Sequence, residues 1–397
     1  MTKKLVIVCL VNFLIAAFLG LILRFANIYS LNINYRFFTH AHSHIAMLGW
    51  AYLMLYLLLV NYFVLEKKTI YTRLFWITQV AVWGMMFSFP FQGYAVVSIT
   101  FSTLHILCSY VFIFVIWKHI KTEKRISEIL LKTSLFFMAL STLGVWFLGP
   151  AVGLYGNTSD FYQIAIQFFL HFQFNGWFLF AVIGLFSLIL GIKDSVECQI
   201  FYWTLLLATL FTFALPINWY FTHETLYWGN AFGVLLQVVA FILFLKIIKP
   251  TLHSMPARAS KLEIYLYSVS IFCLSIKVAL QLTSLLPDFS QVIYQHRYFV
   301  IGFIHLLMLG TVTGFLFAFL MRNQLTRPSS SLSFGVFCFL AGFLLTEMLL
   351  FIQGYLYFAE LPIMPHYNLF LFIASVFLPI GIALILYNLI NSKNHVA

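Results

Sequence analysis

The sequence predicts an all-α, polytopic transmembrane bundle of about twelve helices. Of its 397 residues, 63% are hydrophobic and 8% are charged, whereas a soluble domain is about 45–50% apolar and about 25% charged. Apolar runs long enough to cross a bilayer recur along the whole chain,. These runs are continuous rather than alternating, which excludes an outer-membrane barrel.

The apolar runs predict twelve spans and no linker that would separate two domains. The spans cover residues 5–25, 42–65, 71–89, 94–117, 128–150, 161–191, 197–217, 226–248, 263–286, 298–321, 331–358 and 367–391. We therefore expect residues 1–397 to form a single integral membrane domain. An even number of spans places both termini on the same side of the membrane.

Lys and Arg concentrate in alternate loops, and this distribution predicts on which side of the membrane the termini lie. The two termini and the loops on their side hold 18 of the 22 Lys and Arg residues. The opposite loops hold Arg24, Arg36 and Arg297, and Lys277 lies inside the ninth span. The positive-inside rule then places both termini in the cytoplasm. The net charge of +11 is thus explained by topology, and it does not indicate nucleic-acid binding.

Cysteines and nucleotide motifs exclude several other classes of site. The five cysteines are scattered and form no CxxC pair, so neither a disulfide framework nor a thiolate metal site is predicted. No Walker motif, GxGxxG fingerprint or CxxCH haem-attachment motif is present,. Covalent haem and nucleotide-driven transport are therefore disfavoured.

The histidines are the residues that indicate a haem or metal site. Nine of the twelve fall in external loops or in the external half of a span: His40, His42, His44, His105, His171, His223, His296, His305 and His366. We expect His44, His105, His171 and His305 to lie within spans, where an ionisable side chain is costly and usually functional. Imidazoles that converge from different helices suit a haem or a metal ion.

Each of these histidines also has a structural interpretation. A single histidine in a span often only hydrogen-bonds a neighbouring helix, and for His105 this is as good an explanation as ligation. The run from His40 to His44 is also compatible with an interfacial cluster, with His40 and His42 among the lipid headgroups.

Four short motifs occur in the order and on the side expected for one family. Span two carries His44-Ile-Ala-Met-Leu-Gly49, which is echoed in span ten by His305-Leu-Leu-Met-Leu-Gly310. Span six carries His171-Phe-Gln-Phe-Asn175-Gly176-Trp177, and span eight begins with Trp228-Gly229-Asn-Ala-Phe232. Together they resemble subunit I of the haem-copper oxidase superfamily, with motifs most similar to the nitric oxide reductase large subunit. The motifs of spans two and ten also resemble the NnrS family.

This resemblance implies a set of ligands and partners. His44 and His305 would be the axial ligands of a non-covalent haem b, and His171 and His223 would hold copper or non-haem iron. It implies electron transfer or the handling of oxygen or nitric oxide, a cytochrome or quinol as electron donor, and the bacterial inner (cytoplasmic) membrane. The sequence leaves open which of His40, His42 and His44 is the axial ligand, and whether the protein is an enzyme.

The sequence departs from the family pattern at the second centre. The family's high-spin haem ligand is replaced by Phe303, which cannot coordinate iron, and the glutamate of its sixth helix is replaced by Asn175. We therefore expect the low-spin haem site without a complete high-spin haem site. The alternatives are a twelve-span small-molecule transporter or channel, and an assembly protein whose histidines only join helices.

Overall fold

Helices account for every regular element that the structure describes. The computed structural model describes residues 3–64, 68–254 and 259–392. Twelve helices, or runs of consecutive helices, are long and apolar enough to cross a membrane. The prediction of a polytopic helical bundle is therefore confirmed, and the protein is a multi-pass membrane protein.

The chain divides into two compact units. Residues 1–119 and 316–397 form the first, here called unit one, and residues 120–315 form the second, called unit two. The division falls within the tenth span, Tyr298–Arg322, so that one continuous span contributes to both units.

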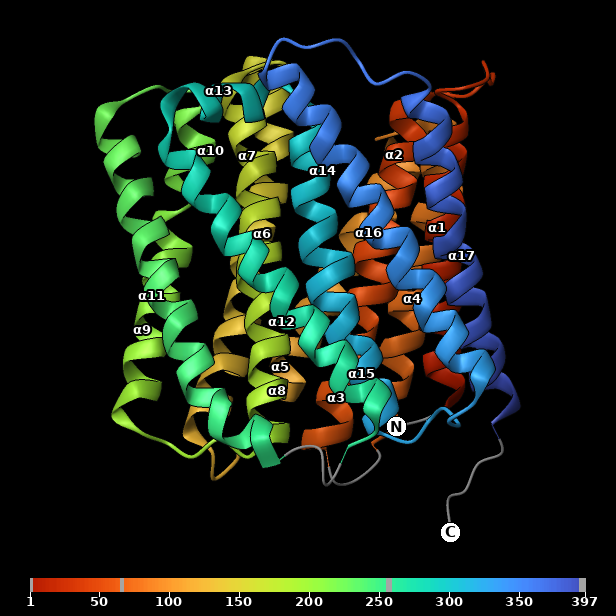
Figure 1. The fold of residues 1–397 in the computed structure, drawn as a ribbon, viewed down its shortest axis with the longest axis vertical. Coiled ribbons are helices and arrows are strands. Elements are labelled where there is room, and N and C mark those ends of the chain that lie inside the picture. The colour runs from red at the N-terminus through yellow and green to blue at the C-terminus, as the bar shows by residue number, and fades with distance from the viewer. Residues whose placement is uncertain (1–2, 65–67, 255–258, 393–397) are drawn as a thin grey trace. The chain divides into compact units, whose positions relative to one another are not determined.

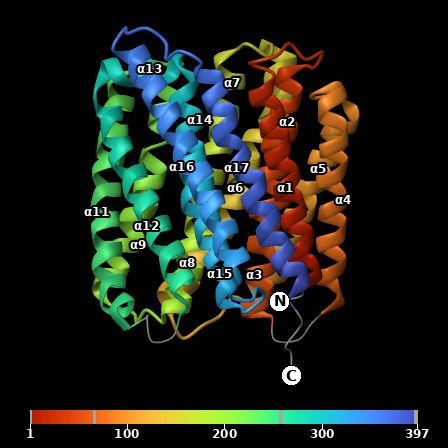
Figure 2. The same ribbon diagram turned by 45° about the vertical axis from the view of Figure 1, so that its right-hand side comes forward.

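Unit one brings the two ends of the chain together. It contains α1 (Lys3–Phe25), α2 (Tyr35–His44), η1 (Ile45–Tyr52), α3 (Leu53–Phe63), α4 (Thr69–Gln92), α5 (Val96–Trp117), most of α15 (Gly314–Arg322), α16 (Ser330–Phe358) and α17 (Tyr367–Asn391). Helix α17 packs against both α1 and α16, and Figure 2 shows it between them. The Lys3 ammonium donates to the carbonyl oxygens of Ile390 and Ser392. The first and last helices therefore start and finish at the same end of unit one, as an even number of spans requires.

Glycines explain how closely α16 and α17 pack. A Cβ atom on Gly381 would lie 2.5 Å from the backbone nitrogen of Phe339 and 2.6 Å from the carbonyl oxygen of Gly335. Small residues let helix backbones approach in a membrane, where van der Waals contact is a main source of helix association.

Unit two is built around the sixth span. It contains α6 (Arg125–Tyr155), α7 (Asp160–His171), η2 (Phe172–Phe178), α8 (Leu179–Leu190), α9 (Val196–Phe211), α10 (Ala214–Asn218), α11 (Glu224–Ser254), α12 (Lys261–Leu282), η4 (Thr283–Leu285), α13 (Pro287–Gln295), α14 (Arg297–His305) and η5 (Leu306–Thr313). Helices α7, η2 and α8 form one continuous span that packs along α6. Helix α9 runs beside α11 (Figure 1).

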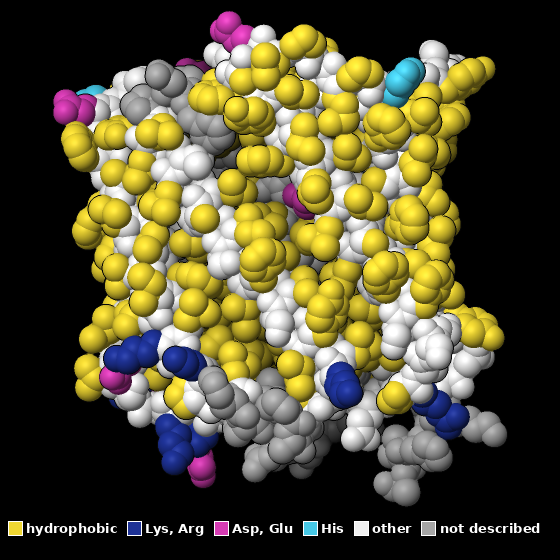
Figure 3. Space-filling model, in the orientation of Figure 1, with side chains coloured by type: hydrophobic (Ala, Val, Ile, Leu, Met, Phe, Trp, Pro, Cys, Tyr) yellow, Lys and Arg dark blue, Asp and Glu magenta, His cyan; other side chains and the backbone are white. Residues whose placement is uncertain are grey.

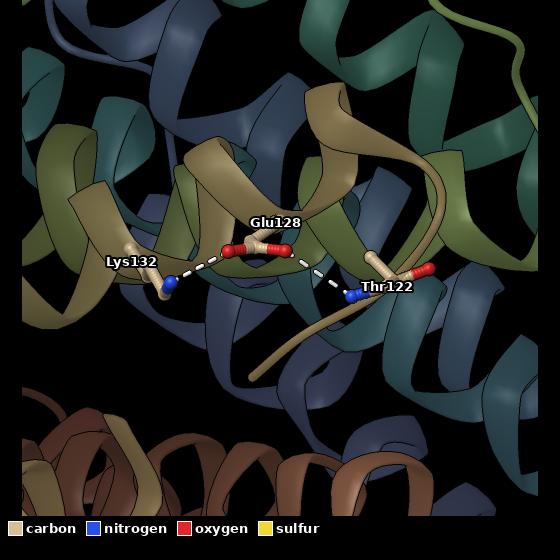
Figure 4. A network of polar contacts seen from close by, with 3 residues as sticks. All are labelled: Thr122, Glu128 and Lys132. Carbon is tan, nitrogen blue, oxygen red and sulfur yellow. Dashed lines mark hydrogen bonds and ion pairs between the residues drawn. The ribbon is translucent and has the colours of Figure 1, made fainter. Parts of the chain in front are cut away.

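Carboxylates fix the start of α6. Both oxygens of Asp194 accept hydrogen bonds from the first amides of the helix, at 2.9 Å from Arg125 N and 2.8 Å from Ile126 N. The Glu128 carboxylate accepts from Thr122 N at 3.1 Å and from Lys132 Nζ at 2.6 Å (Figure 4). Negative groups near a helix N-terminus satisfy its free amides and interact favourably with the positive end of its dipole.

The surface matches a bilayer rather than water. On the face drawn in Figure 3, hydrophobic side chains cover the length of the helices, and Lys and Arg lie near helix ends. Large apolar side chains such as Phe91, Phe114 and Phe337 are 85%, 78% and 65% exposed. A soluble monomer rarely exposes apolar surface on this scale, so we assign these faces to contact with lipid.

The second span begins earlier than the sequence predicts. Its helix starts at Tyr35, not at residue 42, and Asn34 caps it by accepting from Phe37 N at 3.2 Å. His40 and His42 are therefore helical and continuous with His44. The polar stretch before residue 42 lowers the local hydropathy, and for this reason the apolar run alone places the start too late.

Candidate functional site

Three spans share one motif and one backbone distortion. His44, His171 and His305 are each the last residue of an α-helix, and each is followed at once by a π-helical segment: η1, η2 and η5. In all three the fifth residue after the histidine is glycine: Gly49, Gly176 and Gly310. The echo between spans two and ten thus has a third copy in span six, which sequence reasoning missed although the same spacing was there to find it.

The three copies recur every fourth span and are the most buried part of the chain. In spans two, six and ten, 78% of the most apolar stretch is buried, against 28% to 50% in the other nine. A π-helical segment breaks the regular i to i+4 hydrogen-bond ladder and is frequent at functional sites. The motif therefore marks three interior spans.

Side chains from neighbouring helices support two of the π segments. In unit one, Asn12 of α1 donates to the carbonyl oxygen of Gly49 at 2.9 Å and pairs reciprocally with Gln79 of α4, at 2.8 and 3.0 Å. In unit two, Ser141 of α6 donates to Gln173 Oε1 at 2.8 Å, and the rings of Phe137 and Phe172 stack 5.5 Å apart. The distorted segments are thus held by buried polar and aromatic contacts.

The His44 imidazole is held in the tautomer that a metal ligand needs. Its Nδ1 lies 2.8 Å from the carbonyl oxygen of His40, which only accepts, so Nδ1 carries the proton. Nε2 then has the lone pair and accepts from the Tyr94 hydroxyl at 3.3 Å. The ring lies against Phe89, with 4.5 Å between centroids. A second hydrogen bond that fixes the tautomer and the ring orientation is typical of ligating histidines.

The other histidines of unit one have distinct surroundings. His42 Nδ1 lies 2.8 Å from the carbonyl oxygen of Ala16, so this ring joins α2 to α1. The His40 ring contacts the rings of Phe89 and Tyr94, which also contact each other. His105 of α5 is 4% exposed, its ring packs against Tyr52, and its Nε2 has no hydrogen-bond partner among the described residues.

His171 uses the opposite ring nitrogen from His44. Its Nε2 lies 2.8 Å from the carbonyl oxygen of Thr209, in the last turn of α9, so Nε2 donates and Nδ1 has the lone pair. The amide of Phe213, which would bond this carbonyl in a continued helix, donates to Leu210 O instead. His171 thus satisfies a carbonyl that the end of α9 leaves without its helical partner.

His223, the second predicted metal residue, lies outside the spans in the exposed turn before α11. Its Nδ1 accepts from Thr225 N at 3.2 Å, and its own amide donates to Asn218 Oδ1 at 3.0 Å. A neutral imidazole that accepts at Nδ1 carries its proton on Nε2. Within the described ranges, no three His, Cys, Asp or Glu side chains gather as metal ligands. Metal binding by His171 and His223 stays a prediction.

His305 ends α14 and is partly exposed. It belongs to unit two, whereas His44 belongs to unit one. Two residues earlier, the ring of Phe303 lies under the Lys277 ammonium, with 5.9 Å between Nζ and the ring centroid. The pairing of His44 with His305 around a haem stays a prediction.

Comparison with known proteins adds no family to this picture. No protein-family model matches the chain, and no curated protein is significantly similar to it.

Proposed function

We propose that this protein binds haem b in the membrane as a divergent relative of haem-copper oxidase subunit I, and that it transfers electrons or handles oxygen or nitric oxide. The observation that carries the proposal is the recurrence of the histidine, π-helix and glycine motif in spans two, six and ten. These spans carry His44, His171 and His305, three of the four histidines that the family resemblance implies as ligands.

The His44 side of the proposed haem site fits this cofactor. Nε2 of His44 has a lone pair, Nδ1 is anchored to a backbone carbonyl, and the surrounding rings of Phe89 and Tyr94 are suited to pack against an apolar macrocycle. The other axial ligand in this proposal is His305. A haem held by two histidines supplies one-electron transfer, at a potential set by its ligands and burial.

Two positions argue against a second haem of the oxidase type. Phe303 replaces the ligand histidine of the high-spin haem, and its ring is engaged by Lys277. Asn175 replaces the sixth-helix glutamate, and its side-chain amide donates to the His171 carbonyl at 3.4 Å. We therefore propose no reduction of oxygen or nitric oxide at a paired metal centre. The electron donor would be a cytochrome or a quinol.

The proposed location is the cytoplasmic membrane of a bacterium, with both termini inside. The distribution of Lys and Arg supports this orientation,. It places the N-terminal ends of spans two, six and ten, and with them the three histidines, toward the outer face.

An absorption spectrum of the detergent-purified protein from haem-replete cells tests the proposal. We expect a Soret band that falls at least about tenfold per mole of protein in His44→Ala and in His305→Ala, because each removes an axial ligand. His42→Ala, which alters the same helix, should keep the band. His40→Ala should keep it too, because the backbone carbonyl that holds His44 remains.

Two results would reject the proposal. One is a protein that folds but is colourless after expression in haem-replete cells. The other is a Soret band that is unchanged in both His44→Ala and His305→Ala. Either result would leave the two alternatives, a small-molecule transporter or channel and an assembly protein.

A further inference from the structure

Lys277 is a buried cation that neither the fold nor the proposed haem site uses. It lies in α12 within the ninth span, its side chain is 0% exposed, and its Nζ has no hydrogen-bond partner among the described residues. The Phe303 ring, 5.9 Å from Nζ, offers a cation–π contact. Such a contact compensates only part of the cost of burying an ammonium group.

The register of α11 and α12 places a second polar residue on the facing helix. The span formed by α12 and η4 runs antiparallel to α11, and the two meet where Asn230 Nδ2 donates to Ser284 Oγ of η4 at 3.1 Å. Gln237 follows Asn230 by seven residues along α11, and Lys277 precedes Ser284 by seven along the other span. Seven residues are about two helical turns. The two faces that meet at Asn230 and Ser284 therefore present Gln237 and Lys277 deeper in unit two.

Two glutamines on these spans also have a side-chain oxygen without a hydrogen bond among the described residues. Gln237 is 6% exposed, and its Oε1 is buried without a hydrogen bond within the described ranges. The same holds for Oε1 of Gln281, one turn beyond Lys277 on α12. His171 is the neighbouring titratable group that Lys277 affects electrostatically, and its Nε2 is already bonded to Thr209. Native proteins leave few buried polar atoms unpaired, and each one calls for an explanation.

We propose that Lys277, Gln237 and Gln281 form a binding site for a small monovalent oxoanion that retains a hydroxyl group, such as hydrogencarbonate. The negative charge neutralises the Lys277 ammonium, which donates to the anion oxygens. The hydroxyl donates to a glutamine Oε1 atom. A metal cation is excluded by the ammonium group, and an apolar ligand would leave all three polar atoms without hydrogen bonds.

This site is separate from the proposed haem ligands. It lies wholly within unit two, and none of its three residues is a histidine. A negative result for haem binding would therefore not contradict this anion site.

Isothermal titration of the purified full chain with sodium hydrogencarbonate tests the site. The titration is made at constant pH and ionic strength, with sodium gluconate as the balancing salt. We expect saturable binding, at least about tenfold weaker in Lys277→Met, which removes the charge and keeps an unbranched side chain of similar length. Lys193→Met, which removes an exposed charge from the loop after α8, should bind as the unmodified chain does.

Further probes separate the contribution of the anion's charge to binding from the contribution of its hydroxyl group. Sodium formate carries the same charge without a hydroxyl, and we expect it to bind severalfold more weakly than hydrogencarbonate. Gln237→Leu should remove most of that difference and leaves the charge in place. If Lys277→Met does not fold, Lys277→Arg and Gln237→Leu serve instead, with binding retained in the former and weakened in the latter.

Three outcomes would overturn the proposal. They are no saturable binding by the folded chain, equal affinity in Lys277→Met, and equal loss in Lys193→Met. The first would mean that water alone satisfies these three side chains.

Discussion

His44 in unit one and His171 in unit two follow the same local sequence rule but fix their rings in opposite ways. Each ends an α-helix, precedes a π-helical segment and lies five residues before a glycine. His44 hydrogen-bonds through Nδ1 to a carbonyl one turn back in its own helix. His171 hydrogen-bonds through Nε2 to a carbonyl of another helix, α9.

The difference shows that the motif is associated with the local backbone conformation, whereas the contacts around each ring determine which imidazole nitrogen carries the proton. His44 bonds within its own helix and keeps its lone pair on Nε2, which accepts from the Tyr94 hydroxyl. His171 joins its span to α9 and keeps its lone pair on Nδ1. The same motif therefore presents a different ring nitrogen in each unit.

The largest effect that we expect is on stability, and it differs between alanine substitutions at Gly176 in η2 and at Gly49 in η1. A Cβ atom on Gly176 would lie 2.5 Å from Cγ and 2.6 Å from Cβ of Phe137, close to the α6 backbone, where little can move. On Gly49 it would meet Asn12 and Val82 at 3.0 Å. We expect Gly176→Ala to lower the free energy of unfolding by about 3 kcal/mol and Gly49→Ala to lower it by about 1 kcal/mol. Unfolding in sodium dodecyl sulfate measures both.

Gly153→Ala is the matched control, because nothing lies within 4 Å of a Cβ atom at that helical position. It should change stability by less than about 1 kcal/mol, and in the stabilising direction. Equal losses for Gly176→Ala and Gly153→Ala would mean that η2 is not tightly packed against α6.

The next largest effect compares how His171 and His44 contribute to stability and to haem binding. His171→Leu leaves the Thr209 carbonyl without its donor and should destabilise by about 2 kcal/mol. His171→Gln keeps an N–H at a similar distance from the backbone and should recover most of that loss. Unfolding in sodium dodecyl sulfate again provides the measurement, with the Soret band recorded in parallel.

At His44 the same two substitutions should show the reverse pattern. Both should abolish the Soret band, and both should cost little stability, because the lost hydrogen bond lies within one helical turn. If His171→Leu also abolished the band without destabilising the fold, the assignment of roles to the two histidines would have to be exchanged.

The sequence predicts the spans well because hydropathy is a property of single residues summed along the chain. All twelve predicted runs overlap a candidate span of the structure, and the last, 367–391, has the bounds of α17. The early start at Tyr35 was not predicted, because Arg36, Thr39 and His40 lower the apolar content of that turn. The cap residue Asn34 was the available signal for it.

Interactions between helices were beyond what the sequence could predict. The run 197–217 reads as one span, but α9 ends at Phe211, and this break leaves the carbonyl that His171 bonds. The tautomer of each histidine follows from such contacts and not from the motif. That Lys277 Nζ has no hydrogen-bond partner among the described residues likewise depends on which faces of α11 and α12 meet. These facts depend on helix phase, which a hydropathy pattern of continuously apolar spans does not contain.

The smallest effect that we expect concerns the support of the first π segment. Asn12→Leu removes the donor to Gly49 O and both hydrogen bonds with Gln79. Hydrogen bonds between transmembrane helices average about 0.6 kcal/mol, since the unfolded chain in the membrane finds other partners, so we expect a loss of about 1 kcal/mol. The double variant Asn12→Leu with Gln79→Leu should be no less stable than Asn12→Leu alone, because it removes the unpaired amide. A loss in the double variant equal to the sum of the two single losses would mean that Asn12 and Gln79 act independently. The π segment η1, which contains Gly49, would then not depend on the pairing of these two side chains.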